Sequence, residues 1–251
     1  MQEQILRVEH LRVDYGQVQA LEDMTLSIPK GVRAAVVGPN GAGKSTFFKA
    51  ILGLEKATQG QVTLFGQSNQ LEQIIKDKVA YIPQASQVNW NFPATVYDIV
   101  MMGRFAHITG LFKRPRALDR QKVEEALETM RLTDLKDRQI DQLSGGQRQR
   151  VFIARALVQE ADLYLMDEPL AGVDIETEKI IMATLKTFQE QGKTSIVIHH
   201  DLTTVSSYFD YMVWLNRRAV AAGPLKEVMT EANYLATYRV QDVSLLFGKE
   251  G

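Results

Sequence analysis

Gly38-Pro-Asn-Gly-Ala-Gly-Lys44-Ser45 is the stretch of this chain that decides its fold. It matches the pattern G-x-x-x-x-G-K-[ST], follows a compact apolar run at residues 33–37, and precedes a helix expected to begin near Ser45. Glycines let the backbone curl so that several N–H groups point at one anion, and the helix N-terminus adds a partial positive charge. The sequence therefore predicts a phosphate-binding loop in which Lys44 reaches the β- and γ-phosphates and Ser45 offers a hydroxyl to Mg²⁺.

Strands alternating with helices surround this loop. Turn residues such as Gly16 and Gly66 separate short apolar runs in the first third of the chain, and later runs are typical of buried strands in a mainly parallel sheet. Helical spacing appears at residues 123–130 and at 180–188, where Gly192 is placed to end the second helix. The pattern indicates an α/β fold. The predicted strands are residues 5–8, 11–15, 24–28, 33–37, 62–65, 163–166, 195–198 and 211–215.

Composition excludes several kinds of chemistry. Hydrophobic residues make up 45% of the 251 residues and charged residues 24%, which is the balance of an ordinary globular protein. The formal net charge of −1 gives no reason to expect binding to nucleic acid or to anionic lipid. The chain has no cysteine, so disulfides, thiolate metal sites and cysteine nucleophiles are excluded, and a reducing compartment is expected.

No stretch of the sequence is expected to enter a membrane. The first residues lack the basic-then-apolar build of a signal peptide. The longest uncharged stretch, residues 79–97, contains prolines and amide side chains, which do not suit a membrane span. If the protein works at a membrane, another chain is expected to hold it there.

A second apolar run ends in two carboxylates, Asp167 and Glu168, followed by a proline. In enzymes with this phosphate-binding loop, an aspartate at such a place holds Mg²⁺, and Glu168 is placed to polarise a water for in-line attack on the γ-phosphate. The alternative is that the acidic pair only caps the following helix. A triphosphate requires a hard cation with oxygen ligands, which favours the first interpretation.

Leu143-Ser144-Gly145-Gly146-Gln147 opens another helix and forms a second anion-binding end. Ser144 is the expected N-cap, and the two glycines expose the first backbone N–H groups. The alternative is an ordinary capped helix. Because the first loop already surrounds the phosphates of one ATP, two such sites on one chain suggest that each completes a pocket on a partner.

With these motifs in order, the chain resembles the ABC ATPase family from about residue 5 to residue 225. The resemblance implies a P-loop NTPase fold of the RecA-like type, with an N-terminal antiparallel β subdomain and a helical subdomain. Residues 1–84 and 160–225 are expected to form the nucleotide-binding core with its β subdomain. Residues 85–159 are expected to form the helical signature subdomain, and residues 226–251 a C-terminal tail.

The resemblance also assigns roles to single residues. Tyr15 matches the aromatic residue that stacks on adenine, the alternative being a core tyrosine in an edge strand. Gln84 matches the glutamine that contacts Mg²⁺ and the attacking water. Of the two adjacent histidines, His200 aligns with the γ-phosphate switch and His199 is expected to be structural. Asp174 ends a loop that crosses to the partner, although Ala-Gly-Val-Asp departs from the commoner Ser-Ala-Leu-Asp.

The implied cofactors are ATP and Mg²⁺, and the implied sites fall into three sets. The catalytic set is Glu168, His200, Gln84 and Lys44, and the metal set is Ser45, Gln84 and Asp167. The ATP-binding set is Tyr15, Gly38, Pro39, Asn40, Gly41, Ala42, Gly43, Lys44, Ser45, Thr46, Ser144, Gly145, Gly146 and Gln147.

The implied assembly is a homodimer of ATPase subunits, head to tail, with each ATP between one chain's loop and the partner's signature helix. An integral membrane permease would hold this dimer at the cytoplasmic face of the cell membrane, and an extracytoplasmic substrate-binding protein would complete the system. No nucleic acid is expected to bind.

A docking surface for the permease is expected to follow Gln84. Interleaved aromatic and basic residues there could receive a cytoplasmic helix, the alternative being that the aromatics fill a small helical core. The residues are Trp90, Asn91, Phe92, Pro93, Phe105, Leu111 and Phe112, near Lys113 and Arg114.

The cargo is suggested only by the family resemblance. The stretch from Tyr81 to Arg104, together with the paired histidines, resembles the manganese, zinc and iron uptake branch of the family. The two other functions considered are a soluble ABC ATPase, for example in iron–sulfur assembly, and a nucleotide-gated binding module with little hydrolysis. A small-molecule kinase would leave the signature helix unexplained.

Overall fold

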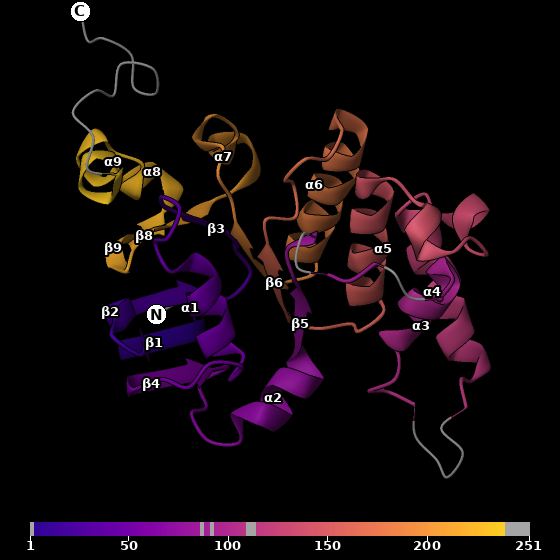
Figure 1. Ribbon diagram of the computed structural model, residues 1–251, viewed down its shortest axis with the longest axis horizontal. Coiled ribbons are helices and arrows are strands. Elements are labelled where there is room, and N and C mark those ends of the chain that lie inside the picture. The colour runs from indigo at the N-terminus through magenta and orange to yellow at the C-terminus, as the bar shows by residue number, and fades with distance from the viewer. Residues whose placement is uncertain (1–2, 86–87, 91–92, 109–113, 239–251) are drawn as a thin grey trace, which may run out of the picture.

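Two sheets organise the chain, and the computed structural model describes residues 3–85, 88–90, 93–108 and 114–238 (Figure 1). The larger sheet has the strand order β5-β6-β7-β3-β8-β9, and its strands are parallel except for the β8–β9 pair. The smaller sheet has the order β2-β1-β4 and is antiparallel. The predicted α/β class, with a mainly parallel core, an antiparallel sheet and a helical part, is confirmed.

The parallel strands are short apolar runs that are buried on both faces. Alternate side chains of each strand enter two separate cores, so that Ala35 and Val37 face one core while Ala34 and Val36 face the other. The larger sheet comprises β3 (Arg33–Val37), β5 (Val79–Ile82), β6 (Leu163–Asp167), β7 (Thr194–Ile198), β8 (Tyr211–Asn216) and β9 (Arg218–Pro224). Because β5, β6, β7 and β3 are parallel neighbours, their carboxyl ends meet at one edge.

The antiparallel sheet consists of β1 (Gln4–Tyr15), β2 (Val18–Pro29) and β4 (Gln59–Leu64). Two of the predicted strands, residues 5–8 and 11–15, form the single strand β1, whose register shifts around His10. His10 has a left-handed φ of 51°, which is the conformation of a bulge rather than of a turn between strands. Helix α1 (Lys44–Ile51) places Phe47 and Phe48 in the core shared by the two sheets.

A helical part forms the right-hand side of Figure 1. It contains α3 (Val96–Met102), α4 (Ala117–Thr129) and α5 (Gly145–Leu157), with 3₁₀ turns η2 (Thr133–Leu135) and η3 (Ile140–Gln142). Gly103 lets α3 approach α5 closely, because a Cβ there would lie 2.2 Å from the Arg155 carbonyl oxygen. The buried Arg104 next to it donates to the Asp119 carboxylate at 3.0 Å and to Glu160 at 2.7 Å.

Several short elements were not predicted from the sequence. They are β5, β9, α2 (Leu71–Lys78), α7 (Leu202–Tyr208), α8 (Leu225–Val228) and α9 (Glu231–Tyr238). The long helix α6 (Ile175–Glu190) was predicted, and Gly192, with a φ of 75°, follows its end. Across the described part of the chain, every helix is too short or too polar to span a bilayer.

Candidate active site

The glycine-rich loop leaves β3 and enters α1, as predicted. Gly43 is the N-cap of α1 with a φ of 91°, and a Cβ there would lie 2.6 Å from the Ala20 carbonyl oxygen. A Cβ on Gly38 would lie 1.9 Å from the Leu215 carbonyl oxygen. Both positions therefore require glycine, Gly43 for its left-handed backbone and both for close backbone approach. The loop is clamped between β2 and the end of β8.

Lys44 is held at the centre of this loop. Its ammonium group donates to the Gly38 carbonyl at 2.8 Å and to the Pro39 carbonyl at 2.9 Å, and its side chain is buried. Burial lowers the pKa of Lys44, and the nearby Glu168 and Asp167 carboxylates act in the opposite direction. A buried cation in a curl of backbone is suited to binding phosphate oxygens.

Asp167 ends β6 and is completely buried. Among the described residues, neither of its carboxylate oxygens has a hydrogen-bond partner of good geometry. Burial raises the pKa of Asp167, while the facing Ser45 hydroxyl and the Lys44 ammonium lower it. A buried carboxylate with unsatisfied oxygens beside a serine hydroxyl is the donor set that a hard cation such as Mg²⁺ takes up.

Glu168 brings together three residues that are distant in the sequence. Its Oε2 accepts a hydrogen bond of 2.9 Å from the Gln84 amide, and its Oε1 lies 2.5 Å from His200 Nε2. Each partner follows the carboxyl end of a neighbouring strand, Gln84 after β5 and His200 after β7. Glu168 also has a left-handed φ of 55°, which is uncommon for a non-glycine residue and is found chiefly at functional sites.

The alternative in which the acidic pair caps a helix is wrong. Helix α6 begins at Ile175, and its N-cap is Asp174, whose carboxylate accepts a hydrogen bond of 2.8 Å from the Thr177 amide. Asp167 and Glu168 lie before that cap, and Asp174 is the residue that accepts from the first turn. Their place at the sheet edge leaves both carboxylates for chemistry beside the loop.

His199 has the structural place expected for it. It is buried, its Nε2 lies 2.8 Å from the Thr204 hydroxyl, and its ring lies 5.4 Å from the ring of Phe209. Burial lowers its pKa, so the neutral form is favoured. His200 faces Glu168 instead. Among the residues that the structure describes, no three His, Cys, Asp or Glu side chains lie close enough together to hold a metal ion.

Tyr15 lies at the end of β1 with 42% of its surface exposed, so the alternative of a core tyrosine is wrong. Its hydroxyl contacts Thr46 and Glu55, and burial of the phenol raises its pKa. Contact with Thr46 places the ring beside the start of α1, where the glycine loop ends. An exposed ring at this position can offer its face to a planar base.

The second glycine motif has the predicted cap. The Ser144 hydroxyl accepts from the Gln147 amide at 3.3 Å, and the Gln147 side chain accepts from the Ser144 amide at 2.9 Å. Ser144 and Gly145 are exposed, and a Cβ on Gly145 would meet no atom within 4 Å. None of the hydrogen bonds or ion pairs within the described residues joins 144–147 to the loop at 38–46. One chain thus contains both motifs without bringing them together.

The reading of the sequence missed two features beside the site. The Arg217 amide donates to the Ala42 carbonyl at 2.7 Å, so the end of β8 is bonded to the glycine loop. Tyr238, the last residue of α9, lines a cavity of about 390 Å³ together with Pro39 of the loop. No motif marks either residue. Only the apolar run of β8 could have drawn attention to this edge.

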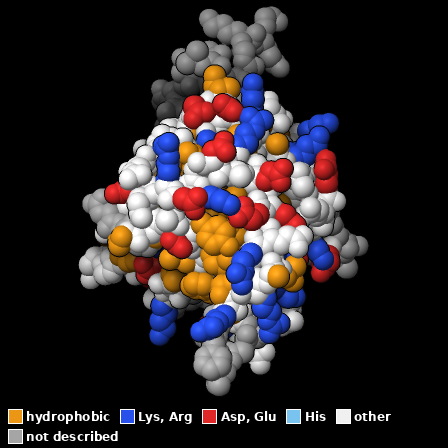
Figure 2. All heavy atoms as spheres, turned by 90° about the vertical axis from the view of Figure 1, so that its right-hand side faces the viewer, with side chains coloured by type: hydrophobic (Ala, Val, Ile, Leu, Met, Phe, Trp, Pro, Cys, Tyr) orange, Lys and Arg blue, Asp and Glu red, His pale blue; other side chains and the backbone are white. Residues whose placement is uncertain are grey.

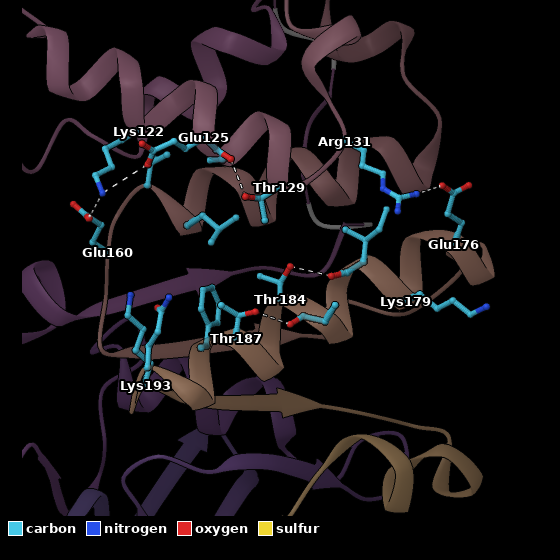
Figure 3. A pocket seen from close by; sticks show the side chains of 17 residues that line it. Lys122, Glu125, Thr129, Arg131, Glu160, Glu176, Lys179, Thr184, Thr187 and Lys193 are labelled. Atoms are coloured by element: carbon cyan, nitrogen blue, oxygen red, sulfur yellow. Dashed lines mark hydrogen bonds and ion pairs between the residues drawn. The ribbon is translucent and has the colours of Figure 1, made fainter.

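A cavity in the helical part of the molecule is separate from the site. It has a volume of about 680 Å³ and lies between α4, the end of α5 and α6 (Figure 3). Lys122 faces Glu160 at one end, and the Arg131–Glu176 ion pair of 2.7 Å lies at the other. None of the predicted site residues lines it.

Comparisons with known proteins identify relatives for almost the whole chain. The sequence profile of a family described as "ABC transporter" matches residues 21–171. The chain is 46% identical to the zinc transport system ATP-binding protein TroB of Treponema pallidum, over 96% of this chain and 90% of that protein. It is 44% identical to the manganese transport system ATP-binding protein MntB of Bacillus subtilis, over 93% of this chain and 92% of that protein.

Solved structures show the same fold. An inward-facing metal-chelate type ABC transporter matches with a TM-score of 0.80 and 31% identity, covering 95% of this chain and 90% of that one. A dimeric ATP-binding cassette in a post-hydrolysis state, bound to ADP and phosphate, matches with a TM-score of 0.76 and 27% identity. That match covers 88% of this chain and 98% of the solved one.

Proposed function

The chain belongs to the ABC transporter family as an ATP-binding and hydrolysing subunit, and we propose that it powers transport of a divalent metal cation through a separate permease. Manganese and zinc are the cations named for relatives that are 44% and 46% identical to this chain. Uptake is the direction that the sequence resemblance favours. Identity of this degree over more than nine-tenths of the chain supports the proposal that the cargo is manganese or zinc. No side chain in the ATPase site determines which cargo is transported.

The observation that carries the mechanism is the meeting of Gln84, Glu168 and His200 beside Lys44. Glu168 accepts a proton from water as the water oxygen forms a bond to the γ-phosphorus. The bond from that phosphorus to the β–γ bridging oxygen breaks, and its electron pair leaves with ADP. Gln84 and His200 fix the position of the carboxylate, and Lys44 neutralises negative charge on the phosphate oxygens.

The residues present fit Mg²⁺. Asp167 provides the buried carboxylate with unsatisfied oxygens, and Ser45 provides a hydroxyl close to it. Gln84, whose amide nitrogen donates to Glu168, would add its amide oxygen from the adjacent strand end. When bound, Mg²⁺ would neutralise charge on the β- and γ-phosphates. The same ion would relieve the cost of burying an ionised Asp167.

We also infer a head-to-tail dimer with two composite sites. The N-terminus of α5 presents the exposed Ser144 and Gly145, and within the described residues a Cβ on Gly145 would meet no atom within 4 Å. A backbone N–H cluster at the start of a 13-residue helix attracts phosphate oxygens. The dimeric solved cassette with ADP and phosphate supports the same arrangement for this chain. ATP would then lie between one chain's loop and the partner's α5.

A cleft directly before Gln84 is the proposed docking site for a cytoplasmic helix of the permease. The cleft has a volume of about 360 Å³ and takes its walls from both the sheet core and the helical part. Pro83 and Tyr81 line one side, and Met102 and Ala106 line the other. A permease helix in this cleft would contact the segment that positions Gln84. The position of that helix could therefore follow the state of the nucleotide. A substrate-binding protein would deliver the cargo on the far side of the membrane.

Part of the docking surface expected from the sequence has another role. Trp90 is half-buried, stacks edge-on against Phe152 at 5.0 Å, and donates from its indole to the Ala85 carbonyl at 3.1 Å. Arg148 lies 5.3 Å from the indole ring centre. Trp90 thus packs into the helical part, while Phe105 is 58% exposed. Residues 91, 92 and 111–113 lie outside the described residues.

Figure 2 shows the helical face of the molecule. Hydrophobic side chains gather near the centre of this face, with Lys and Arg side chains along its lower border. A surface of this kind suits contact with another protein more than it suits bulk water. It adds a second area where a permease could be held, next to the helices that carry the cleft.

The proposal is tested by reconstituting the chain with its co-purifying membrane protein in vesicles and measuring ATP-dependent movement of Mn²⁺ and Zn²⁺. We expect metal movement that requires ATP and is lost with Glu168→Gln, whereas the exposed Glu190→Gln leaves it intact. ATP hydrolysis without movement of either metal would overturn the assignment of manganese or zinc as the cargo. Failure of any membrane protein to co-purify would overturn the transport role.

A further inference from the structure

The C-terminal helix α9 packs against β8, the strand that ends beside the glycine loop (Figure 1). The Asn216 side chain, at the end of β8, donates to the Thr237 carbonyl at 2.7 Å. The buried Trp214 ring lies 6.3 Å from the rings of both Tyr234 and Tyr238. These two tyrosines stack on each other at 4.9 Å. The helix is therefore tied to β8 by one amide hydrogen bond and one aromatic cluster.

The same strand end supports the loop from the other side. Next to Asn216, the Arg217 amide donates to the Ala42 carbonyl at 2.7 Å. The Leu215 carbonyl oxygen lies so close to Gly38 that any side chain there would collide with it. The Tyr238 side chain faces the Gly38 backbone amide and lines the cavity that Pro39 also lines. Leu215 of β8, Arg217 directly after β8 and Tyr238 of α9 thus lie around the start of the loop.

We propose that α9 is a positioning element for the phosphate-binding loop, acting through Asn216 and Tyr238, and that it sets the affinity for ATP. The loop binds phosphate through backbone N–H groups, whose directions must be fixed before the ligand arrives. A short helix such as α9 has little stability of its own, so its position depends on these contacts. Anything that shifts α9 is then expected to shift Gly38 and the loop that follows it.

The chemistry of Tyr238 suits a permanent contact rather than a switch. Burial raises its pKa to about 12, and the neighbouring Tyr234 adds to the rise. The hydroxyl therefore stays protonated and neutral across the physiological range. A neutral group beside the loop adds no negative charge that would repel the phosphates. Regulation through α9 would come from displacement of the helix, for example by a partner that binds the C-terminal end of the chain.

The test compares variants of the full chain in a steady-state ATPase assay. Asn216→Ala removes the amide hydrogen bond, and Tyr238→Phe removes the hydroxyl while keeping the ring. Each is expected to raise the KM for ATP about fivefold with less than a twofold change in kcat. The matched control is Asn233→Ala, which removes another amide hydrogen bond of α9, that to the Val228 carbonyl at 2.8 Å, away from the loop.

A purely structural role for α9 gives a different pattern. In that case Asn216→Ala and Asn233→Ala would lower the thermal midpoint alike and leave KM unchanged. The proposal is overturned if KM stays within about twofold of the wild type in both Asn216→Ala and Tyr238→Phe, or if Asn233→Ala raises KM as much as they do. If Asn216→Ala does not fold, Tyr238→Phe alone decides the outcome, because it preserves the aromatic cluster.

Discussion

Replacing Glu168 with glutamine should stop hydrolysis without disturbing the fold. Glutamine has the same shape as glutamate, and the side chain is only 18% exposed and held by Gln84 and His200. The change removes the proton acceptor for the attacking water, and loss of a general base costs about 10²–10⁴ in rate. That factor corresponds to about 3–5 kcal/mol of activation free energy. ATP binding should not weaken, because one negative charge near the phosphates is lost.

The rate is measured as phosphate release from saturating ATP, and the assembly state by light scattering with and without ATP. The predicted result for Glu168→Gln is a rate at least about 10² below the wild type, with a dimer that persists in ATP. Glu190→Gln is the control, because Glu190 is exposed on α6 and lies 3.9 Å from Lys186, far from the loop. A variant that hydrolyses ATP within a few-fold of the wild type would refute the role of Glu168 as base.

Three further predictions follow from burial and backbone geometry. Gly43→Ala should abolish ATP binding, because its Cβ would collide with the Ala20 carbonyl. Gly192 has a similar positive φ but open space around it, so Gly192→Ala should lose only about 1 kcal/mol of stability. Isothermal titration measures the binding of both variants, and thermal unfolding measures their stability. Burial raises the pKa of Asp167, so between about pH 4 and this raised pKa the folded protein binds more protons than the unfolded chain. Stability therefore falls as the pH rises through that window, and the ionised group costs stability above it. Asp167→Asn should therefore raise the unfolding midpoint without Mg²⁺ and lose ATPase activity. Arg104→Ala should lower the free energy of unfolding by about 3–5 kcal/mol in urea, because Asp119 is left buried without its charged partner, although it keeps the hydrogen bond from the Arg116 amide.

Much of the site could be predicted because its residues follow strand ends. Parallel strands place their carboxyl ends at one edge, so Gly38, Gln84, Asp167 and His200 had to lie near one another once their strands were neighbours. The roles of the two carboxylates and of the histidine could be predicted from the order of the motifs along the chain, because that order follows the order of the strands. The contacts of Glu168 with Gln84 and His200 could not be predicted from the sequence, because they depend on the positions of the side chains in the folded chain.

Other features could not be predicted for physical reasons. The edge strand β9 is only partly buried, so its residues lack a clear two-residue alternation. The shift at His10 joins two predicted strands into one, which depends on how β1 pairs with its neighbours. The contacts of α9 with β8 come from a helix and a strand that meet only in the folded state. Trp90 was predicted to be a docking residue because aromatic content alone does not distinguish a core residue from a surface residue.

The composite site is tested most directly by mixing two inactive chains. Lys44→Ala destroys the loop, and Ser144→Arg blocks the exposed N-terminus of α5 in the other chain. Each variant alone should be inactive, while the mixture should recover up to about a quarter of wild-type ATPase activity, since half of the dimers contain one intact pair. An inactive mixture in which heterodimers are shown to form, or a fully active Ser144→Arg chain, would contradict the account.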